Sequence, residues 1–292
     1  MKFTTILTGS LLASAALAAP LTEKRRARAE ARAEARRATG LKRKSNPPLS
    51  PATNTPLQHA NISQVEYSSN WAGAVLIGSG YTEVTGEFVV PSVSSPSGSS
   101  GSGGGFGGGF GSGFSSDFGG DTEYCASAWV GIDGDTCETA ILQTGIDFCY
   151  EDGETYYDAW YEWYPDYAYD FDNIDISEGD SIKVTVKATS DTSGTATVEN
   201  VSTGQSVTHS FSGNVEGSLC ETNAEWIVED FESGDSLVAF ADFGTVTFTG
   251  AEAISNGETV TPSGATLMDI EQDGEVLTSV SVDGSAVTVT YV

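Results

Sequence analysis

Apolar and polar residues alternate along much of the second half of the chain, which is the pattern of β-strands with one buried face. The clearest stretch is Ser181–Ala188, in which every second residue from Ile182 onward is apolar. Asp273-Gly274 and Asp283-Gly284 separate alternating runs near the C-terminus and predict tight hairpins. Further strands are predicted at Trp71–Ile77, Tyr81–Val90, Ala126–Ile132, Ala140–Tyr150, Tyr156–Trp163, Ala196–Val201, Glu225–Phe231 and Thr245–Ile254.

These short strands follow one another without helical windows between them, which favours an all-β fold. The 34 glycines and the many Thr and Val residues also weigh against helices. We therefore expect an antiparallel β-sandwich of two packed sheets, formed as one domain by residues 61–292. No window of this domain approaches the ~18 apolar residues of a transmembrane helix.

The N-terminal 60 residues have a different composition from the rest. Met1-Lys2 followed by small and apolar residues predicts a secretory signal peptide over 1–18, with cleavage after Ala18. Residues 19–60 form a basic, Ala/Arg/Glu-rich stretch and a Pro-rich linker, and we interpret them as a pro-segment ending between about residues 45 and 66. Lys42-Arg43-Lys44 is a candidate processing site.

Charge divides the chain at the same place. Residues 1–60 contain eleven Lys/Arg and three Glu and carry +8, whereas residues 61–292 contain 38 acidic residues and two lysines and carry −36, which together give the net charge of −28. A body so acidic repels nucleic acid and anionic membranes, so neither is an expected partner. The charge fits work in acid, where carboxylates are protonated, and it suggests that the pro-segment docks electrostatically onto the acidic domain.

Residues 97–120 are 12 Gly, 7 Ser, 4 Phe and one Asp. This composition predicts a flexible surface loop, because it cannot offset the entropy of ordering a backbone. A phosphate-binding loop is not expected, because no Lys follows the glycines.

The four cysteines of a secreted chain predict two disulfides, with three possible connectivities. A zinc site is disfavoured because no Cys-x-x-Cys pair exists, and we predict neither a metal nor another cofactor. Asn61-Ile-Ser and Asn200-Val-Ser are acceptor sequons for N-glycans.

Several catalytic mechanisms lack their residues. The chain has two histidines, His59 and His209, and no Gly-x-Ser-x-Gly element, which disfavours a serine triad. Paired Asp-Thr/Ser-Gly elements of an aspartic peptidase are absent as well. Carboxylate chemistry of another kind remains.

Successive side chains of a strand point to opposite faces of the sheet, and this strand parity indicates where a functional site could lie. If the strands around residues 130, 145 and 227 are neighbours in one sheet, five functional side chains share a face, with Gly131 and Gly145 leaving room on its floor. These side chains are Trp129, Asp133, Gln143, Asp147 and Glu225.

Around these residues the chain resembles the glutamic peptidases of filamentous fungi, the eqolisins. The matching stretches are Tyr67–Ala74, Trp129–Cys137, Ala140–Cys149 and Ala224–Phe231. The resemblance runs from about Tyr67 to the C-terminus, and the order of signal, basic pro-segment and acidic body is similar too.

The resemblance implies a concanavalin-like sandwich and a pepstatin-insensitive acid endopeptidase that acts on proteins and peptides through a Gln143–Glu225 dyad. Trp129 and Asp133 match positions that support the dyad, and Asp147 is a candidate pocket residue. The implied disulfides are Cys125–Cys149 and Cys137–Cys220. The pro-segment is expected to inhibit its own domain. The secreted product is expected to be a monomer, or two non-covalently held chains if the 97–120 loop is excised.

Two other classes of protein compete with this interpretation. A carbohydrate-active or carbohydrate-binding sandwich also places acidic and aromatic residues on a concave sheet, but a glycosidase needs a second carboxylate where Gln143 stands. A secreted structural protein leaves the dyad unexplained.

Overall fold

The computed structural model describes residues 42–50, 65–96, 122–234 and 236–292. The predicted signal peptide, residues 19–41 of the pro-segment, the Asn61 sequon and the loop at 97–120 therefore lie outside the described residues. Every regular element of the described part is a β-strand. No stretch of it forms a helix with the length and apolar character to cross a membrane.

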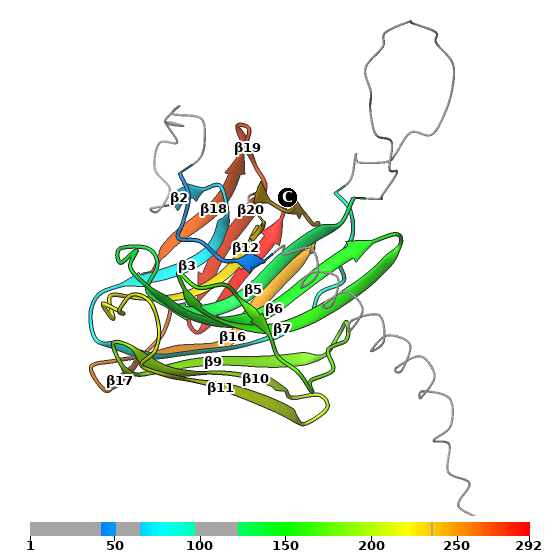
Figure 1. The fold of residues 1–292 in the computed structure, drawn as a ribbon. Helices are drawn as coiled ribbons and strands as arrows, with labels where there is room; N and C mark the ends of the chain where they lie inside the picture. Colours follow the sequence, from blue (N-terminus) through cyan, green and yellow to red (C-terminus); the bar gives the residue numbers. More distant parts are fainter. Residues whose placement is uncertain (1–41, 51–64, 97–121, 235) are drawn as a thin grey trace, which may run out of the picture.

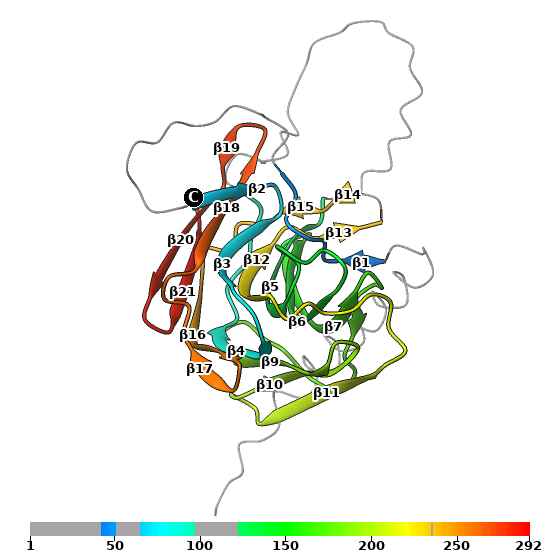
Figure 2. The ribbon, with the colours of Figure 1, turned by 90° about the vertical axis from the view of Figure 1, so that its left-hand side faces the viewer.

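Two large sheets pack face to face, as the alternating pattern predicts (Figures 1 and 2). Eight strands form the first sheet: β11 (Gln205–Ser212), β10 (Ser193–Asn200), β9 (Ser181–Ser190), β4 (Tyr81–Val89), β16 (Thr245–Ser255), β21 (Ala286–Tyr291) and β20 (Thr278–Asp283) in this order, with β17 (Glu258–Val260) beside β16.

The second sheet has ten strands. Its order is β19 (Glu275–Val276), β18 (Thr266–Gln272), β3 (Trp71–Ile77), β12 (Asn223–Glu229), β5 (Tyr124–Ile132), β6 (Ile141–Glu151), β7 (Glu154–Tyr164) and β8 (Tyr169–Asp170), with β15 (Ala239–Phe240) beside β5 and β2 (Val65–Ser68) beside β18. The pairings of β15 and β2 are parallel, and all the others are antiparallel. A small third sheet joins β1 (Arg43–Lys44), β13 (Glu232–Ser233) and β14 (Ser236–Leu237).

The predicted strands are confirmed to within a few residues at their ends, and so are the hairpins. Gln272 and Glu275 flank the Asp273-Gly274 turn as a pair, and β20 and β21 meet at Asp283-Gly284. Asp273 and Gly274 have φ values of 52° and 85°, in the left-handed region that tight hairpin turns require.

The main core lies between the two large sheets. Strand β12 contributes Ala224, Trp226 and Val228 to it, and the first sheet contributes Phe88 and Phe248 among others. Alternation then places Glu225, Ile227 and Glu229 on the opposite face of the second sheet. A second apolar cluster covers that face, and its buried members are Trp71, Val75, Trp129, Ile141, Trp160, Ile227 and Met268. The central strands are therefore buried on both faces.

Candidate active site

Glu225 and Gln143 lie on one row across three neighbouring strands of the second sheet. In the register of β12, β5 and β6, Glu225 is opposite Gly131, and Gly131 is opposite Gln143. Two strand spacings separate the backbones of Glu225 and Gln143, about 9–10 Å. Residues paired across neighbouring strands point to the same face of a sheet, so both side chains project from the face opposite the main core. The glycine between them leaves a gap in this row of side chains, and Glu225 Oε1 and Trp129 Cζ3 border that gap.

Both side chains are fully buried. Neither the Gln143 amide nor the Glu225 carboxyl has a hydrogen-bond partner among the residues that the structure describes. Buried polar groups are ordinarily paired, and leaving one unpaired costs roughly 1–3 kcal/mol. Two such groups side by side indicate a site kept ready for a ligand, since neither contributes to folding through a hydrogen bond.

Gly131 forms the floor of the gap. A methyl group at this position would lie 2.9 Å from Glu225 Oε1 and 2.9 Å from Trp129 Cζ3. A side chain here would therefore push against the candidate catalytic carboxyl. Gly145 has a different role, because a methyl group there would lie 2.3 Å from the backbone oxygen of Ala128. The backbones of β5 and β6 need that glycine to pair closely.

Trp129 is buried beside the dyad, as strand parity predicts. Its indole packs edge-to-face on Trp71, with the ring centroids 5.0 Å apart. Its Nε1–H donates to Glu229 Oε2 at 3.0 Å. Trp129 thus forms a fixed wall of the gap.

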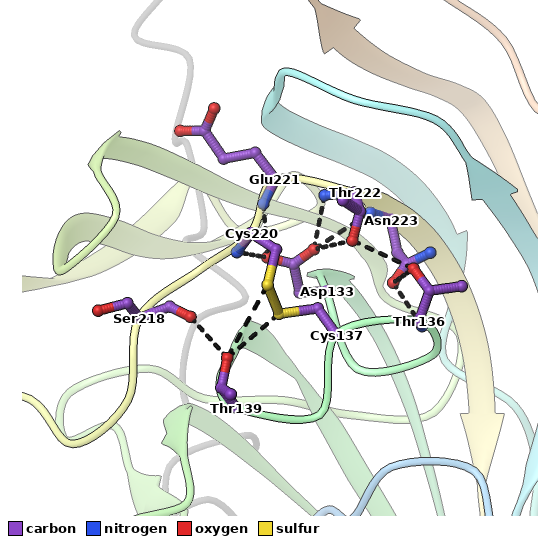
Figure 3. Close-up of a disulfide and its surroundings, with 9 residues drawn as sticks. All are labelled: Asp133, Thr136, Cys137, Thr139, Ser218, Cys220, Glu221, Thr222 and Asn223. Atoms are coloured by element: carbon purple, nitrogen blue, oxygen red, sulfur yellow. Dashed lines mark hydrogen bonds between the residues drawn. A yellow bond between two sulfur atoms is a disulfide. The ribbon is translucent and has the colours of Figure 1, made fainter.

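Asp133 follows β5 and stands in the left-handed region with φ of 69°. Its carboxylate accepts five hydrogen bonds, from the backbone N–H groups of residues 220–223 and from the Thr222 hydroxyl, at 2.7–3.2 Å (Figure 3). The Cys137–Cys220 disulfide closes the same loop. Asp133 therefore supports the site indirectly, because it fixes the segment that leads into β12 and Glu225.

Asp147 lies near the row Glu225–Gly131–Gln143, in a cluster of buried side chains that surrounds Arg43. We call this cluster of Asp147, Glu162 and Ser127 the acidic pocket. The Arg43 Nε lies 2.9 and 2.7 Å from the two carboxylate oxygens of Asp147, and Arg43 Nη1 lies 3.3 Å from Glu162 Oε2. Nη2 donates to Ser127 Oγ at 3.1 Å. The guanidinium also lies over the Trp160 ring, 3.7 Å from its centroid. The pocket thus pairs a cation with carboxylates and an aromatic face, the arrangement that suits an arginine.

Residues 42–50 of the predicted pro-segment lie across this face of the second sheet. The stretch begins at the β13 edge, and its dark blue ribbon crosses the sheet toward β3 in Figures 1 and 2. Ser45 N donates to Glu162 Oε2, and Asn46 N donates to Glu229 Oε1, each at 3.2 Å. Leu49 N donates to Asn70 Oδ1 at 2.7 Å. The hypothesis of Lys42-Arg43-Lys44 as a processing site needs revision for this conformation, since Arg43 is only 7% exposed.

Burial raises the pKa of several carboxyls on this face. Burial and the nearby charges of Asp133 and Asp135 hold the pKa of Glu225 well above its usual range. Burial does the same for Glu162, although Arg43 and Ser45 oppose it. The pKa of Glu229 is raised to about 7, again chiefly by burial. These three groups favour the neutral form in acid.

The disulfides are Cys125–Cys149 and Cys137–Cys220, the pairing that the family resemblance implies. Glu123 lies close to the sulfur atoms of Cys125 and Cys149, but thiols joined in a disulfide cannot act as thiolate ligands for a metal.

The Asn200 sequon does not fit a glycan in the folded protein. Asn200 is fully buried, and its Nδ2 donates to the Asp175 backbone oxygen at 2.9 Å and to Asp180 Oδ2 at 2.8 Å. A sugar on that nitrogen would break these bonds and have no space. A sequon consists of three residues and carries no information on whether its asparagine is buried.

Sequence reasoning did not include Glu162, Glu229 or Asn70 among the candidate residues of this site. Glu229 shares the parity of Glu225, and Glu162 stands opposite Gln143 in the register of β6 and β7. Strand parity therefore indicates the face on which these two glutamates lie. Only the order of the strands in the sheet shows that they lie near the dyad, unlike the many other acidic residues. Asn70 precedes β3, where no alternation applies.

Comparison with known proteins decides the family. The peptidase A4 family matches residues 69–291. Aspergillopepsin-2 of Aspergillus niger is 73% identical over 294 residues, which span all of both chains. The chain belongs to the peptidase A4 family.

Solved structures of A4-type glutamic peptidases share the fold. Scytalido-glutamic peptidase, bound to a transition-state analogue inhibitor, has a TM-score of 0.65 and 46% identity, covering 77% of this chain and 98% of its own. The structure of SCP-B, a member of the eqolisin family in complex with the tripeptide Ala-Ile-His, has a TM-score of 0.61 and 45% identity over the same shares. The protein is thus a glutamic peptidase built as a β-sandwich, and the carbohydrate-active and structural alternatives lose their support.

Proposed function

We propose that the protein is a secreted acid endopeptidase in which Glu225 and Gln143 perform catalysis and residues 42–50 hold the enzyme in a latent form. The observation that carries the proposal is the row Glu225–Gly131–Gln143. Its two polar side chains are buried on one face of the sheet, on either side of a glycine, and neither has a hydrogen-bond partner among the described residues. Substrates are proteins and peptides, in keeping with the peptide-bound relatives.

The row supplies the groups that peptide hydrolysis requires. Ionised Glu225 takes a proton from a water molecule as the water oxygen attacks the carbonyl carbon of the substrate. The Gln143 side-chain N–H donates a hydrogen bond to the developing oxyanion. Glu225 then passes its proton to the amide nitrogen as the C–N bond breaks, releasing an amine and a carboxylic acid. An amide does not titrate, so Gln143 remains a donor in acid.

The described conformation favours a latent enzyme. Glu225 must be ionised to accept a proton, but its burial holds the pKa well above the usual range and keeps the carboxyl neutral in acid. Hydration of the carboxyl in an open cleft removes the main cause of that shift. Opening the face therefore creates the base as well as admitting the substrate.

Arg43 supports the role of residues 42–50 as an inhibitor. It inserts a guanidinium into the pocket of Asp147, Glu162 and Ser127, and the chain that follows uses Glu229 and Asn70 as acceptors. Acid neutralises Glu162 and Glu229 and thereby weakens these contacts. The basic segment is expected to release at low pH, after which proteolysis removes it.

Secretion is supported by two observations of different kinds. The N-terminal sequence fits a signal peptide, and two disulfides link the domain, which is typical of chains that fold in an oxidising compartment. The active product is proposed to be a monomer, or two non-covalently held chains if the 97–120 loop is cut.

Site variants and pepstatin test the proposed mechanism. Gln143→Ala should lower kcat by about 10²–10³, the usual loss for one oxyanion donor. Glu225→Gln should abolish acid proteolysis while keeping the shape of the site. The exposed Glu252 offers a matched control, and Glu252→Gln should retain full activity. Near-normal activity of the Gln143 variant, or inhibition of the wild type by pepstatin, would reject the proposal.

A further inference from the structure

A second glutamate of strand β12 lies on the same face as Glu225. Glu229 is four residues further along the strand and fully buried. The proposed chemistry does not use it, and burying a carboxyl without a role in folding or function is costly. Its contacts therefore need an explanation.

The two oxygens of Glu229 have different partners. Oε2 accepts the indole N–H of Trp129 at 3.0 Å, and both residues are buried. Oε1 faces Asn46 N at 3.2 Å and Asn70 Nδ2 at 3.5 Å. The carboxyl is thus held on one side by the sheet and on the other by the chain that lies across it.

The far edge of the same indole reaches Glu225. Trp129 Cζ3 and Glu225 Oε1 each lie 2.9 Å from the place of a methyl group on Gly131, so they share the space above that glycine. Trp71 packs edge-to-face on the indole, and the Cβ of Trp129 lies over Gly145. The ring therefore spans the distance from Glu229 to Glu225 as a rigid body.

We propose that Glu229 is a positioning residue, which holds the Trp129 indole in the orientation that supports the catalytic Glu225 carboxyl. This inference rests on the proposed function of Glu225. Without an acceptor at residue 229, the buried indole N–H loses its partner and the ring can rotate toward another one. A shift of about 1 Å at a reacting group can lower the rate about 100-fold.

Glutamine is a conservative replacement for Glu229 in acid. In the described conformation burial raises the pKa of Glu229 to about 7, so its side chain is a neutral carboxyl in the acid range. Glutamine has the same length and one carbonyl oxygen that can accept the indole N–H. Methionine has a similar length and shape but no oxygen. Glu229→Gln and Glu229→Met therefore separate the hydrogen bond from packing.

The experiment measures kcat and KM of the full chain after acid activation, for both variants and for the Glu252→Gln control. Glu229→Met is expected to lower kcat at least tenfold with KM changed less than about threefold, and Glu229→Gln to restore kcat to within about threefold of wild type. In parallel, ¹⁵N-tryptophan NMR follows the indole N–H of Trp129, assigned by its loss in Trp129→Phe. This resonance should move in Glu229→Met and stay near its place in Glu229→Gln.

A folded Glu229→Met variant with wild-type kcat, equal losses in the two variants, or an indole resonance unmoved in Glu229→Met would each overturn the inference. If Glu229→Met does not fold, Glu229→Ala takes its place with the same expectations. An inactive wild-type chain would instead refute the proposed function, and the indole resonance would still test the Glu229–Trp129 contact by itself.

Discussion

At the scale of single residues, glycines shape the site as much as the polar groups do. Gly131 and Gly145 lie on adjacent strands of the sheet, but a methyl group would meet different atoms at each. At Gly131 it would meet the ends of the Glu225 and Trp129 side chains, and at Gly145 it would meet the backbone of Ala128 and the Cα and Cβ of Trp129. The first glycine serves the chemistry and the second serves the fold.

Alanine substitutions should separate these two roles. Gly131→Ala should displace the Glu225 carboxyl and lower kcat about 10- to 100-fold, with a loss of stability of no more than about 1–2 kcal/mol. Gly145→Ala should destabilise the domain by about 3 kcal/mol or more, because the backbone cannot move aside without breaking the β5–β6 pairing. Urea unfolding together with peptidase kinetics would measure both. A stable and fully active Gly131→Ala variant would contradict this account of the floor.

Much of the candidate site was predictable from residue patterns, but its inner arrangement was not. Alternation correctly placed Gln143, Glu225 and Trp129 on one face, because parity in a strand depends only on counting. Asp133 was placed there too, although its left-handed backbone ends the strand and turns its carboxylate onto the loop at residues 220–223. Strand parity does not predict the residue at which a strand ends.

At the scale of elements, the strands were easier to predict than the segment of residues 42–50 that covers the second sheet. Every predicted strand exists, and the apolar residues of these strands pack into the clusters on the faces of the two sheets. Residues 42–50 form only the two-residue strand β1. They are held by hydrogen bonds to Asp147, Ser127 and Glu229, which lie 84–183 positions away in the sequence. Local sequence indicated a basic arm but could not indicate that Arg43, among eleven basic residues, enters the acidic pocket.

The inhibitory role of this element predicts that Arg43 matters more than its basic neighbours. Removing one partner of a buried ion pair is costly, whereas the Lys42 side chain is exposed and lies over the Tyr167 ring. In the full chain, Arg43→Ala should hasten activation after acidification at least about tenfold, and Lys42→Ala less than about threefold. Proteolysis of a quenched peptide, followed over time after a pH jump, gives both rates. Equal rates in the two variants would show that bulk charge, and not the pocket, holds the segment.

At the scale of the whole molecule, the charge of −36 on residues 61–292 is only part of the response to pH. Buried carboxyls add a specific contribution. Burial raises the pKa of Asp230 well above its usual range and that of Asp269 to about 6, in addition to the shift of Glu229 to about 7. Each of these groups is therefore protonated more easily in the folded protein than in the unfolded chain.

The sign of the pH dependence follows from these shifts. A carboxyl whose pKa is higher in the folded than in the unfolded chain binds more protons when folded, so its contribution to stability is complete below about pH 4 and is lost as the pH rises through the folded value. For Glu229 and Asp269 the loss falls between about pH 4 and pH 6–7. Each such group lowers the free energy of unfolding by up to about 1.4 kcal/mol per pH unit in that window. The protein should therefore be most stable in acid and become labile toward neutrality.

Asp230 offers a direct test of this explanation. Its Oδ2 accepts a hydrogen bond from Gln272 Nε2 at 2.6 Å, and its Oδ1 has no partner among the described residues. Asp230→Asn keeps the acceptor but cannot ionise, so the free energy of unfolding should fall less steeply between pH 4 and pH 7 than in the wild type. Urea unfolding at unit steps of pH would give the slopes, with the exposed Glu252→Gln as a control that changes surface charge alone. If Glu252→Gln flattens the curve as much as Asp230→Asn does, general repulsion among surface carboxylates and not burial sets the pH range of the enzyme.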